Sequence, residues 1–336
     1  MCYNAGKPPQ NYSNLESENT LSQTVVNCPR CARKTPAVRA LCLYCGEPLP
    51  VTKIETAPEQ RAIDSNELAF NTVLEPVAGT LMGRSESALA SALKLTSAEV
   101  STFIESRKPV PLARCQSRQE AEMIAELVRT CGMGAVVVAD EELQLNSDLI
   151  RAKRIIHTAD GIQVQHSDGA LGVSASEIKL LVVGRLRNTR VDFTESKAGM
   201  RSRASTVLDT AEFFSEETLL DVYASNLGQS FRIKSDGFDY SGIVSPLSFR
   251  TEVNFGGLID ALHAVAPAAI IDHDFAECSH LYSRAWPERS RTESGGVKRT
   301  GLAYRPVSKS SVIKDNRDQF ERYSRLMFIF NARSKL

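Results

Sequence analysis

The sequence lacks the features that mark membrane and secreted proteins. No apolar run approaches the ~20 residues that a membrane-spanning helix needs, and the start of the sequence has no apolar stretch of the signal-peptide kind. The formal net charge is zero, so the chain as a whole is neither strongly basic nor strongly acidic. We therefore expect a soluble protein with a cytoplasmic location.

The sequence also lacks the short motifs of common enzyme classes. It contains no G-x-G-x-x-G, P-loop, G-x-S-x-G or H-E-x-x-H pattern. We therefore predict no catalytic or cofactor-binding residue, and an enzyme remains only a third hypothesis for residues 145–280.

One polar run, "IDHDFAECSH", gathers side chains that are able to bind a metal or transfer a proton. It is either a second metal or acid–base site or a solvated loop that follows a helix. The side chains in question belong to Asp272, His273, Asp274, Glu277, Cys278 and His280.

What is present is an ordinary globular composition, with 42% apolar and 24% charged residues. A length of 336 residues predicts two or three domains. We expect a multi-domain α+β protein. Its predicted parts are a disordered N-terminus (1–27), a cysteine segment (28–50), a linker (51–67), a compact α/β module (68–140), a strand-rich domain (150–268) and a basic C-terminal extension (269–336).

Four of the eight cysteines lie within residues 28–50. Cys28 and Cys31 form one CxxC pair, and Cys42 and Cys45 form a second pair after ten intervening residues. Two such turns can face each other around a tetrahedral Zn²⁺ ion. Four thiolates would leave no open coordination position, so the zinc would be structural, and folding of the segment would depend on it. Disulfide bonds are the alternative.

The cysteine segment resembles the short zinc ribbons of many bacterial and archaeal proteins, whose pattern is roughly CPxCG, a turn, then FCxxCGxPL. Ala32 replaces the family's glycine and Leu41 replaces an aromatic residue. If the turn requires a positive φ, Ala32 costs up to ~1 kcal/mol. The matching residues are Cys28, Pro29, Cys31, Cys42, Cys45, Gly46, Pro48 and Leu49.

The ribbon resemblance implies a structural or protein-docking role. The basic residues around the cysteines, Arg30, Arg33, Lys34 and Arg39, allow a second interpretation as a nucleic-acid patch. They also suit a purely local role, since they offset the charge of four thiolates.

Residues 68–139 are predicted to form β-α-α-β-α-β, with a capping box at Thr96 and Glu99. The stretch "SRQEAEMIAELVRTCGMGAVVV" resembles the C-terminal domain of the bacterial ribosomal stalk protein, whose fold is shared with a Clp protease adaptor. The glycines and helix lysines that bind translation factors in that family are absent here. The resemblance therefore implies either a protein-docking module or a spacer.

Residues 150–268 are predicted to form seven strands, among them separate strands at 178–186 and 189–196, followed by a helix over 254–267. This order suggests a small barrel or sandwich closed by a helix. It resembles that of pleckstrin-homology-like domains, which bind lipids, peptides or each other. The resemblance implies a binding surface without naming its ligand.

From residue 284 to the end, thirteen Lys and Arg oppose five acidic residues, which makes this tail +8 and the rest of the chain −8. Such a tail either binds nucleic acid or anionic lipid, or folds back onto the acidic remainder. Residues 316–331 form a predicted basic amphipathic helix that either contacts a membrane or packs on the protein itself. Its apolar residues are Phe320, Tyr323, Met327 and Phe330, and its basic residues are Arg317, Arg322 and Arg325.

Taken together, these patterns predict a zinc-binding protein that acts as a protein-interaction scaffold or adaptor. The rival interpretation is a nucleic-acid- or ribosome-associated protein that uses the ribbon and the tail formed by residues 284–336.

Overall fold

The computed structural model describes residues 25–36, 44–45, 67–77, 83–197, 205–299 and 306–333. Cys42, the predicted disordered segment up to residue 24 and nearly all of the predicted linker lie outside these residues. The chain divides into two compact units, Met1–Glu55 and Thr56–Leu336. The fold is mixed α+β, and no sheet in the described part of the chain closes into a barrel.

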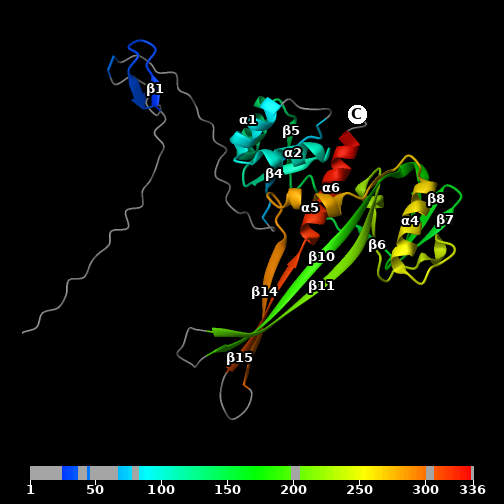
Figure 1. Ribbon diagram of the computed structural model, residues 1–336. Coiled ribbons are helices and arrows are strands. Elements are labelled where there is room, and N and C mark those ends of the chain that lie inside the picture. The colour runs from blue at the N-terminus through cyan, green and yellow to red at the C-terminus, as the bar shows by residue number, and fades with distance from the viewer. Residues whose placement is uncertain are drawn as a thin grey trace, which may run out of the picture. The chain divides into compact units, whose positions relative to one another are not determined.

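The first unit contains a short antiparallel hairpin. Strand β1 (Val25–Asn27) pairs with β2 (Lys34–Pro36), and the turn between them carries Cys28 and Cys31. The hairpin is drawn in blue in Figure 1.

The second unit begins with the element order that the sequence predicts, β-α-α-β-α-β. Strand β3 lies between β4 and β5 in an antiparallel sheet, and Leu89, Val100 and Ile124 of the helices share one core with this sheet. The elements are β3 (Phe70–Leu74), α1 (Gly83–Leu93), α2 (Ser97–Glu105), β4 (Val110–Cys115), α3 (Arg118–Thr130) and β5 (Ala135–Ala139).

Local signals explain the ends of these helices. The predicted capping box at α2 is present, because Thr96 Oγ1 accepts from the Glu99 N–H at 3.2 Å and Glu99 Oε2 accepts from the Thr96 N–H at 2.7 Å. Helix α3 begins after Ser117, whose hydroxyl accepts from the Glu120 N–H. It ends before Gly132, whose φ of 82° is typical of a glycine just after a helix.

The strand-rich region consists of two sheets and a helix around one core. Strands β7, β8 and β9 form an antiparallel sheet, while β6 and β12 belong to a seven-stranded sheet. Helix α4 confirms the predicted helix and buries Leu258 and Leu262 in the core between these sheets. The bounds are β6 (Ile150–Ala152), β7 (Arg154–Thr158), β8 (Gly161–His166), β9 (Gly169–Ser174), β12 (Phe231–Lys234) and α4 (Thr251–Val265).

The predicted barrel is wrong. The two strands predicted at 178–186 and 189–196 are one strand, β10 (Ile178–Lys197), which pairs along its length with β11 (Ser205–Ala224). The other edge of β10 is occupied by β13 (Ile270–Asp272) and β15 (Pro306–Asp315). Strand β10 is thus paired with β11 on one edge and with β13 and β15 on the other, and not with β9. The predicted strands therefore do not follow one another around a small barrel.

The region predicted as a basic C-terminal extension contains further strands and helices besides the predicted amphipathic helix. Strands β14 (Arg289–Arg299) and β15 (Pro306–Asp315) form a second hairpin, which joins β10 at β15. Helices α5 (Phe275–Tyr282) and α6 (Arg317–Arg333) lie before and after it. The hairpin is missed by sequence reasoning because β14 is rich in Arg, Ser and Gly and lacks an alternating apolar pattern.

Helix α6 packs on the protein itself. Phe320, Tyr323 and Leu326 are fully buried, in a cluster that also contains Val73 of β3 and Leu180 of β10. This shared core joins regions that the sequence predicts as separate domains into one compact unit. No helix in the described residues is long and apolar enough to cross a membrane.

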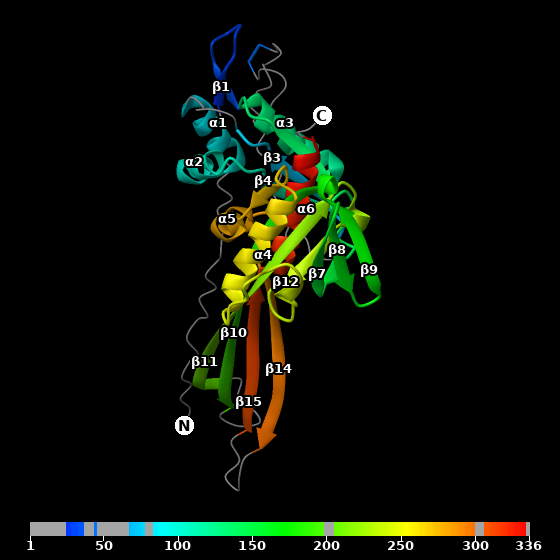
Figure 2. The same cartoon turned by 90° about the vertical axis from the view of Figure 1, so that its right-hand side faces the viewer.

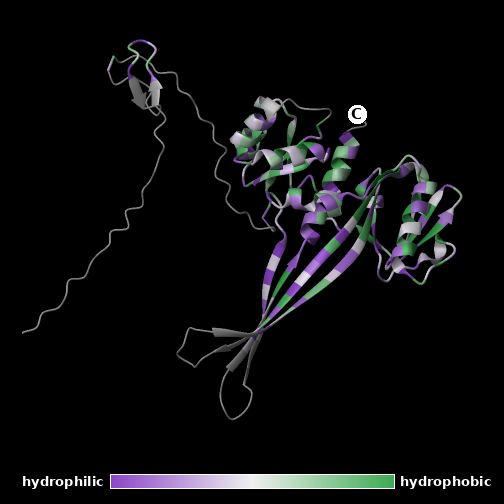
Figure 3. Cartoon of the chain, viewed as in Figure 1, coloured by the Kyte–Doolittle hydropathy of each residue, from purple (hydrophilic) through white to green (hydrophobic). Residues whose placement is uncertain are grey.

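The β14–β15 hairpin and the β10–β11 strand pair together form a four-stranded antiparallel extension in the order β14-β15-β10-β11, which Figure 2 shows below the helices. We call residues 187–197, 205–217, 289–299 and 306–315 the arm. In Figure 3, hydrophilic and hydrophobic bands follow one another along the coloured part of β10, whereas the coloured part of β14 has no hydrophobic band. Phe213 and Phe214 on β11 are 56% and 72% exposed.

Candidate metal centre and polar clusters

Three cysteines of the first unit form a close cluster of thiol groups. The sulfur atoms of Cys28, Cys31 and Cys45 all lie within 4.8 Å of one another, and those of Cys28 and Cys45 are 3.6 Å apart. A tetrahedral zinc with Zn–S bonds of about 2.3 Å places its sulfurs about 3.8 Å apart. The spacing of Cys28 and Cys45 therefore suits two ligands of one metal ion.

The turn that carries Cys28 and Cys31 is fixed by backbone hydrogen bonds. The Cys28 N–H donates to the Arg33 carbonyl at 3.0 Å, and the Ala32 N–H donates to the Cys28 carbonyl at 2.9 Å. Ala32 has a φ of 56°, in the left-handed region that favours glycine. The turn therefore does place Ala32 at a positive φ, the condition under which alanine in place of the family's glycine carries an energetic cost.

The cluster is suited to holding a metal. Cys28 is 2% exposed, none of the three cysteines is in a disulfide, and soft thiolates favour zinc and similar ions. Among the described residues, this is the only group of His, Cys, Asp or Glu side chains whose ligand atoms converge in this way. Cys42, the fourth predicted ligand, lies outside the described residues.

The surroundings of the cluster are basic and exposed. Arg30 and Arg33 are exposed, and the Arg33 guanidinium lies 4.9 Å from the centre of the Tyr44 ring. This stacking uses the cation–π attraction between the two side chains.

The "IDHDFAECSH" run is not a loop. It forms β13 and most of α5, and these elements direct its side chains to different places. Asp272 is buried and bonds to Lys108 Nζ and Tyr323 Oη, both at 2.7 Å. His273 is exposed, and the Nδ1 of His280 bonds to the carbonyl of Glu277 at 2.8 Å.

The electrostatics of this run indicate a structural role. Burial alone would lower the pKa of Lys108, but attraction by Asp272 and Asp274 outweighs it and raises that pKa. Burial raises the pKa of the Cys278 thiol, whose side chain packs against the core of the second unit. Among the described residues, the side chains of this run do not converge as the ligands of a metal ion would, and Asp272 and Asp274 instead share Lys108 as an ion-pair partner.

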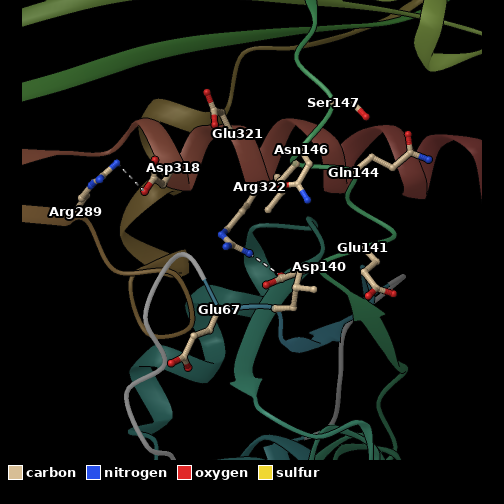
Figure 4. Close-up of a pocket in the computed structure, with 12 residues that line it drawn as sticks. Glu67, Asp140, Glu141, Gln144, Asn146, Ser147, Arg289, Asp318, Glu321 and Arg322 are labelled. Atoms are coloured by element: carbon tan, nitrogen blue, oxygen red, sulfur yellow. Dashed lines mark hydrogen bonds and ion pairs between the residues drawn. The ribbon is translucent and has the colours of Figure 1, made fainter.

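A pocket of about 590 Å³ lies between the end of β5 and α6. Figure 4 shows Arg322 extending from α6 towards Asp140, and Arg289 facing Asp318. Its charged lining residues are Glu67, Asp140, Glu141, Arg289, Asp318, Glu321 and Arg322.

Several of the lining charges are paired within the protein. Arg289 Nη1 lies 3.9 Å from Asp318, and Glu321 accepts from Arg232 at 3.0 Å. The charges of these lining residues are therefore at least partly balanced within the protein.

Asp140 is the centre of a buried polar network. It accepts from Arg114 at 2.7 Å, from Arg322 at 2.6 Å and from the Asn71 side chain at 2.8 Å. The Trp286 indole N–H donates to Asn71 Oδ1 at 2.7 Å. Burial lowers the pKa of Arg322, and the nearby Asp140 opposes this shift. The network fastens α6 to the β3–β4–β5 sheet.

A second buried network holds the other side of α6. Asp221 is fully buried and accepts from the Arg232 guanidinium at 2.6 and 2.9 Å. Ser324 of α6 donates to the same carboxylate at 2.6 Å and bonds to the Tyr223 hydroxyl at 2.9 Å. The sequence gives no signal for either network, because the partners come from distant segments of the chain.

The basic residues of α6 are thus used inside the protein. Arg322 and Arg325 are 6% and 7% exposed, Arg325 donates to the Ser147 carbonyl, and Arg317 pairs with Glu217. This part of the tail folds back onto the acidic remainder, one of the alternatives that the charge distribution predicts.

Comparison of the chain with protein-family models, with curated proteins and with solved structures gives no match. The resemblances to zinc ribbons, to the ribosomal stalk domain and to pleckstrin-homology-like domains therefore remain predictions.

Proposed function

We propose that this chain is a protein-interaction scaffold or adaptor whose N-terminal unit is folded around one structural zinc ion. Cys28, Cys31 and Cys45, with Cys42 as the fourth ligand, would hold the metal. The observation that supports this proposal is the convergence of three sulfur atoms within 4.8 Å, two of them on one tight turn.

A scaffold accounts for the site better than a catalyst does. Four thiolates fill a tetrahedral zinc, so neither water nor substrate can reach the metal. A unit this small buries little apolar surface, and its folding would be coupled to the ion. What the zinc then provides is a rigid surface, on which Arg30, Arg33 and Tyr44 are exposed.

The first experiment is metal analysis of the purified full chain. We expect about one zinc per chain, and its loss when Cys28 and Cys45 are both replaced by serine. Cys131→Ser is the matched control, since Cys131 lies at the end of α3 and should leave the zinc content unchanged. A zinc-free protein with bridged cysteines would contradict the proposal.

The second experiment separates the scaffold from its nucleic-acid rival. Affinity purification of the wild-type chain and of the Cys28→Ser/Cys45→Ser variant should give protein partners that only the wild type retains. Binding to RNA or DNA should be weak at low salt. Tight binding with a steep salt dependence, lost with Arg30→Ala and Arg33→Ala, would instead favour the rival.

A further inference from the structure

A second pocket, of about 370 Å³, lies beside the C-terminal half of α6. Its volume falls within the ~300–1,000 Å³ that is typical of small-molecule sites. One wall is a single face of α6, because the residues that form it recur at helical spacing. The other walls come from the turn after β5 and from the segment after β11. The α6 residues of this wall are Arg325, Phe328, Ile329, Ala332 and Arg333.

The apolar part of the lining rests on the core of the second unit. Leu143, from the turn after β5, is 1% exposed. Leu227, Phe328 and Ile329 pack against the same core cluster. The Phe328 ring also stacks on the fully buried Tyr223 ring, with the two ring centres 4.7 Å apart. The apolar walls are therefore held in place before any ligand enters, which lowers the entropic cost of binding.

Arg325 brings a buried positive charge to this pocket. The residue is 7% exposed, and among the described residues no acidic side chain pairs with it. Its Nη2 donates to the Ser147 carbonyl, and the guanidinium carbon lies 5.9 Å from the centre of the Tyr223 ring. Its Nη1 is buried and has no hydrogen-bond partner in the part of the chain that the structure describes. Arg322, one turn earlier on α6, instead pairs with Asp140 at 2.6 Å. A buried charge without a counter-ion is unfavourable, so Arg325 is suited to an anion from outside the chain.

The remaining charges of the lining balance each other. Glu142 Oε2 lies 3.5 Å from Arg333 Nη2, and Glu142 Oε1 accepts from the Ala139 N–H at 3.1 Å. The charged lining residues are Glu142, Arg325 and Arg333, which gives a net charge of +1. The pocket thus combines apolar walls with one positive charge that has no acidic partner among the described residues.

We propose that this pocket binds a small amphipathic carboxylate, a molecule with an apolar chain or ring that ends in one carboxylate group. The carboxylate lies at the Arg325 guanidinium, whose planar shape matches it, and the apolar part lies against Leu227 and Phe328. A single negative charge suits the net charge of the lining, whereas a phosphate monoester carries about −1.5 to −2 at pH 7. This inference goes beyond the proposed function and depends neither on zinc nor on a scaffold role.

Calorimetric titration of the full chain with three matched compounds tests the proposal. Decanoate should bind saturably, at one molecule per chain, with a dissociation constant below ~1 mM. Decan-1-ol keeps the apolar chain without the charge and should bind at least ~10-fold more weakly. Butyrate keeps the carboxylate with a short chain and should also bind at least ~10-fold more weakly. No binding of decanoate, or equal affinity for decanoate and either of the other compounds, overturns the proposal.

A peptide provides the carboxylate from a different source. A short leucine peptide with a free C-terminal carboxylate should bind more weakly than decanoate, because a peptide backbone has polar groups that apolar walls cannot satisfy. Tighter binding of this peptide than of decanoate overturns the assignment to a small molecule and indicates a protein C-terminus instead.

Two variants locate the binding site. Arg325→Met removes the charge and keeps a long side chain, so it should weaken decanoate at least ~10-fold and leave decan-1-ol unchanged. An equal loss for both compounds would show a merely structural role and overturn the assignment. Ala332→Trp adds a large ring at an exposed position of the lining and should weaken both compounds. Unchanged decanoate binding in Ala332→Trp overturns the location, even if Arg325→Met does not fold.

Arg118→Met is the matched control. It makes the same substitution at the first residue of α3, where the side chain is 62% exposed and does not line the pocket. Circular dichroism verifies that each variant is folded. The control should bind decanoate as the wild type does, and a loss equal to that of Arg325→Met would mean that net charge, and not this pocket, governs binding.

Discussion

Replacement of Asp140 by alanine tests whether the buried network holds α6 in place. The carboxylate is 4% exposed and lies between the guanidinium groups of Arg114 and Arg322, whose side chains are 6% and 7% exposed. Removing it leaves two buried cations without this partner. Breaking a buried ion pair in this way costs about 3–5 kcal/mol, a large share of the ~5–15 kcal/mol that stabilises a typical domain.

Urea unfolding provides the assay, since Trp286 is the only tryptophan and donates a hydrogen bond within the same network. With a slope of about 3 kcal/mol per M, the midpoint should fall by ~1–1.7 M. The control Glu126→Ala removes an exposed ion pair with Arg129 and should cost less than ~1 kcal/mol. A shift for Asp140→Ala no larger than that of the control would refute the reasoning.

Three further predictions follow from single residues. Ala32→Gly should tighten zinc binding, by up to ~1 kcal/mol or about fivefold in a chelator competition, because φ is 56° there. Gly184→Ala should cost ~1–3 kcal/mol in urea unfolding, because a Cβ would lie 2.5 Å from the Phe320 ring. The pKa of Lys108 is raised in the folded protein, so its charged form stabilises the fold below pH ~10.4, the usual pKa of lysine. This stabilisation is lost as the pH rises through the folded pKa. Lys108→Met should therefore remove part of the alkaline loss of melting temperature; an unchanged alkaline profile would contradict it.

Sequence reasoning succeeded where the signal is local. The Thr96–Glu99 capping box and the helical spacing in α3 each depend on residues within a few positions of one another, and the element order from β3 to β5 follows from them. The spacing of Cys28 and Cys31 is equally local, and their sulfurs do converge. The sequence predicts two separate strands on either side of the polar residues after Leu186. In the structure β10 continues across these residues, because it is hydrogen-bonded to β11 and β15 there.

Sequence reasoning failed where the partners are distant. Asp140 meets Arg114 across 26 positions and Arg322 across 182, and no spacing rule connects residues so far apart. The β14–β15 hairpin was missed for a related reason. Strand β15 pairs with β10, more than a hundred residues earlier in the sequence, and β14 pairs with β15; the composition of the two strands does not itself indicate a sheet.

Helix α6 changes how the charge of the tail is to be understood. In the sequence, Arg322 and Arg325 suggest the polar face of a surface helix, yet both are more than nine-tenths buried, beside Gln319 and Ser324. The buried acids Asp140 and Asp221 bond to Arg322 and Ser324 of this helix. Because Arg322 and Ser324 are engaged inside the protein, they are not available to nucleic acid or lipid. Arg289 and Arg291 of β14 are exposed, yet each lies beside an acidic group, at 3.9 Å from Asp318 and at 3.4 Å from Glu293. The positive charge that the described C-terminal residues present to a partner is therefore smaller than the sequence count suggests.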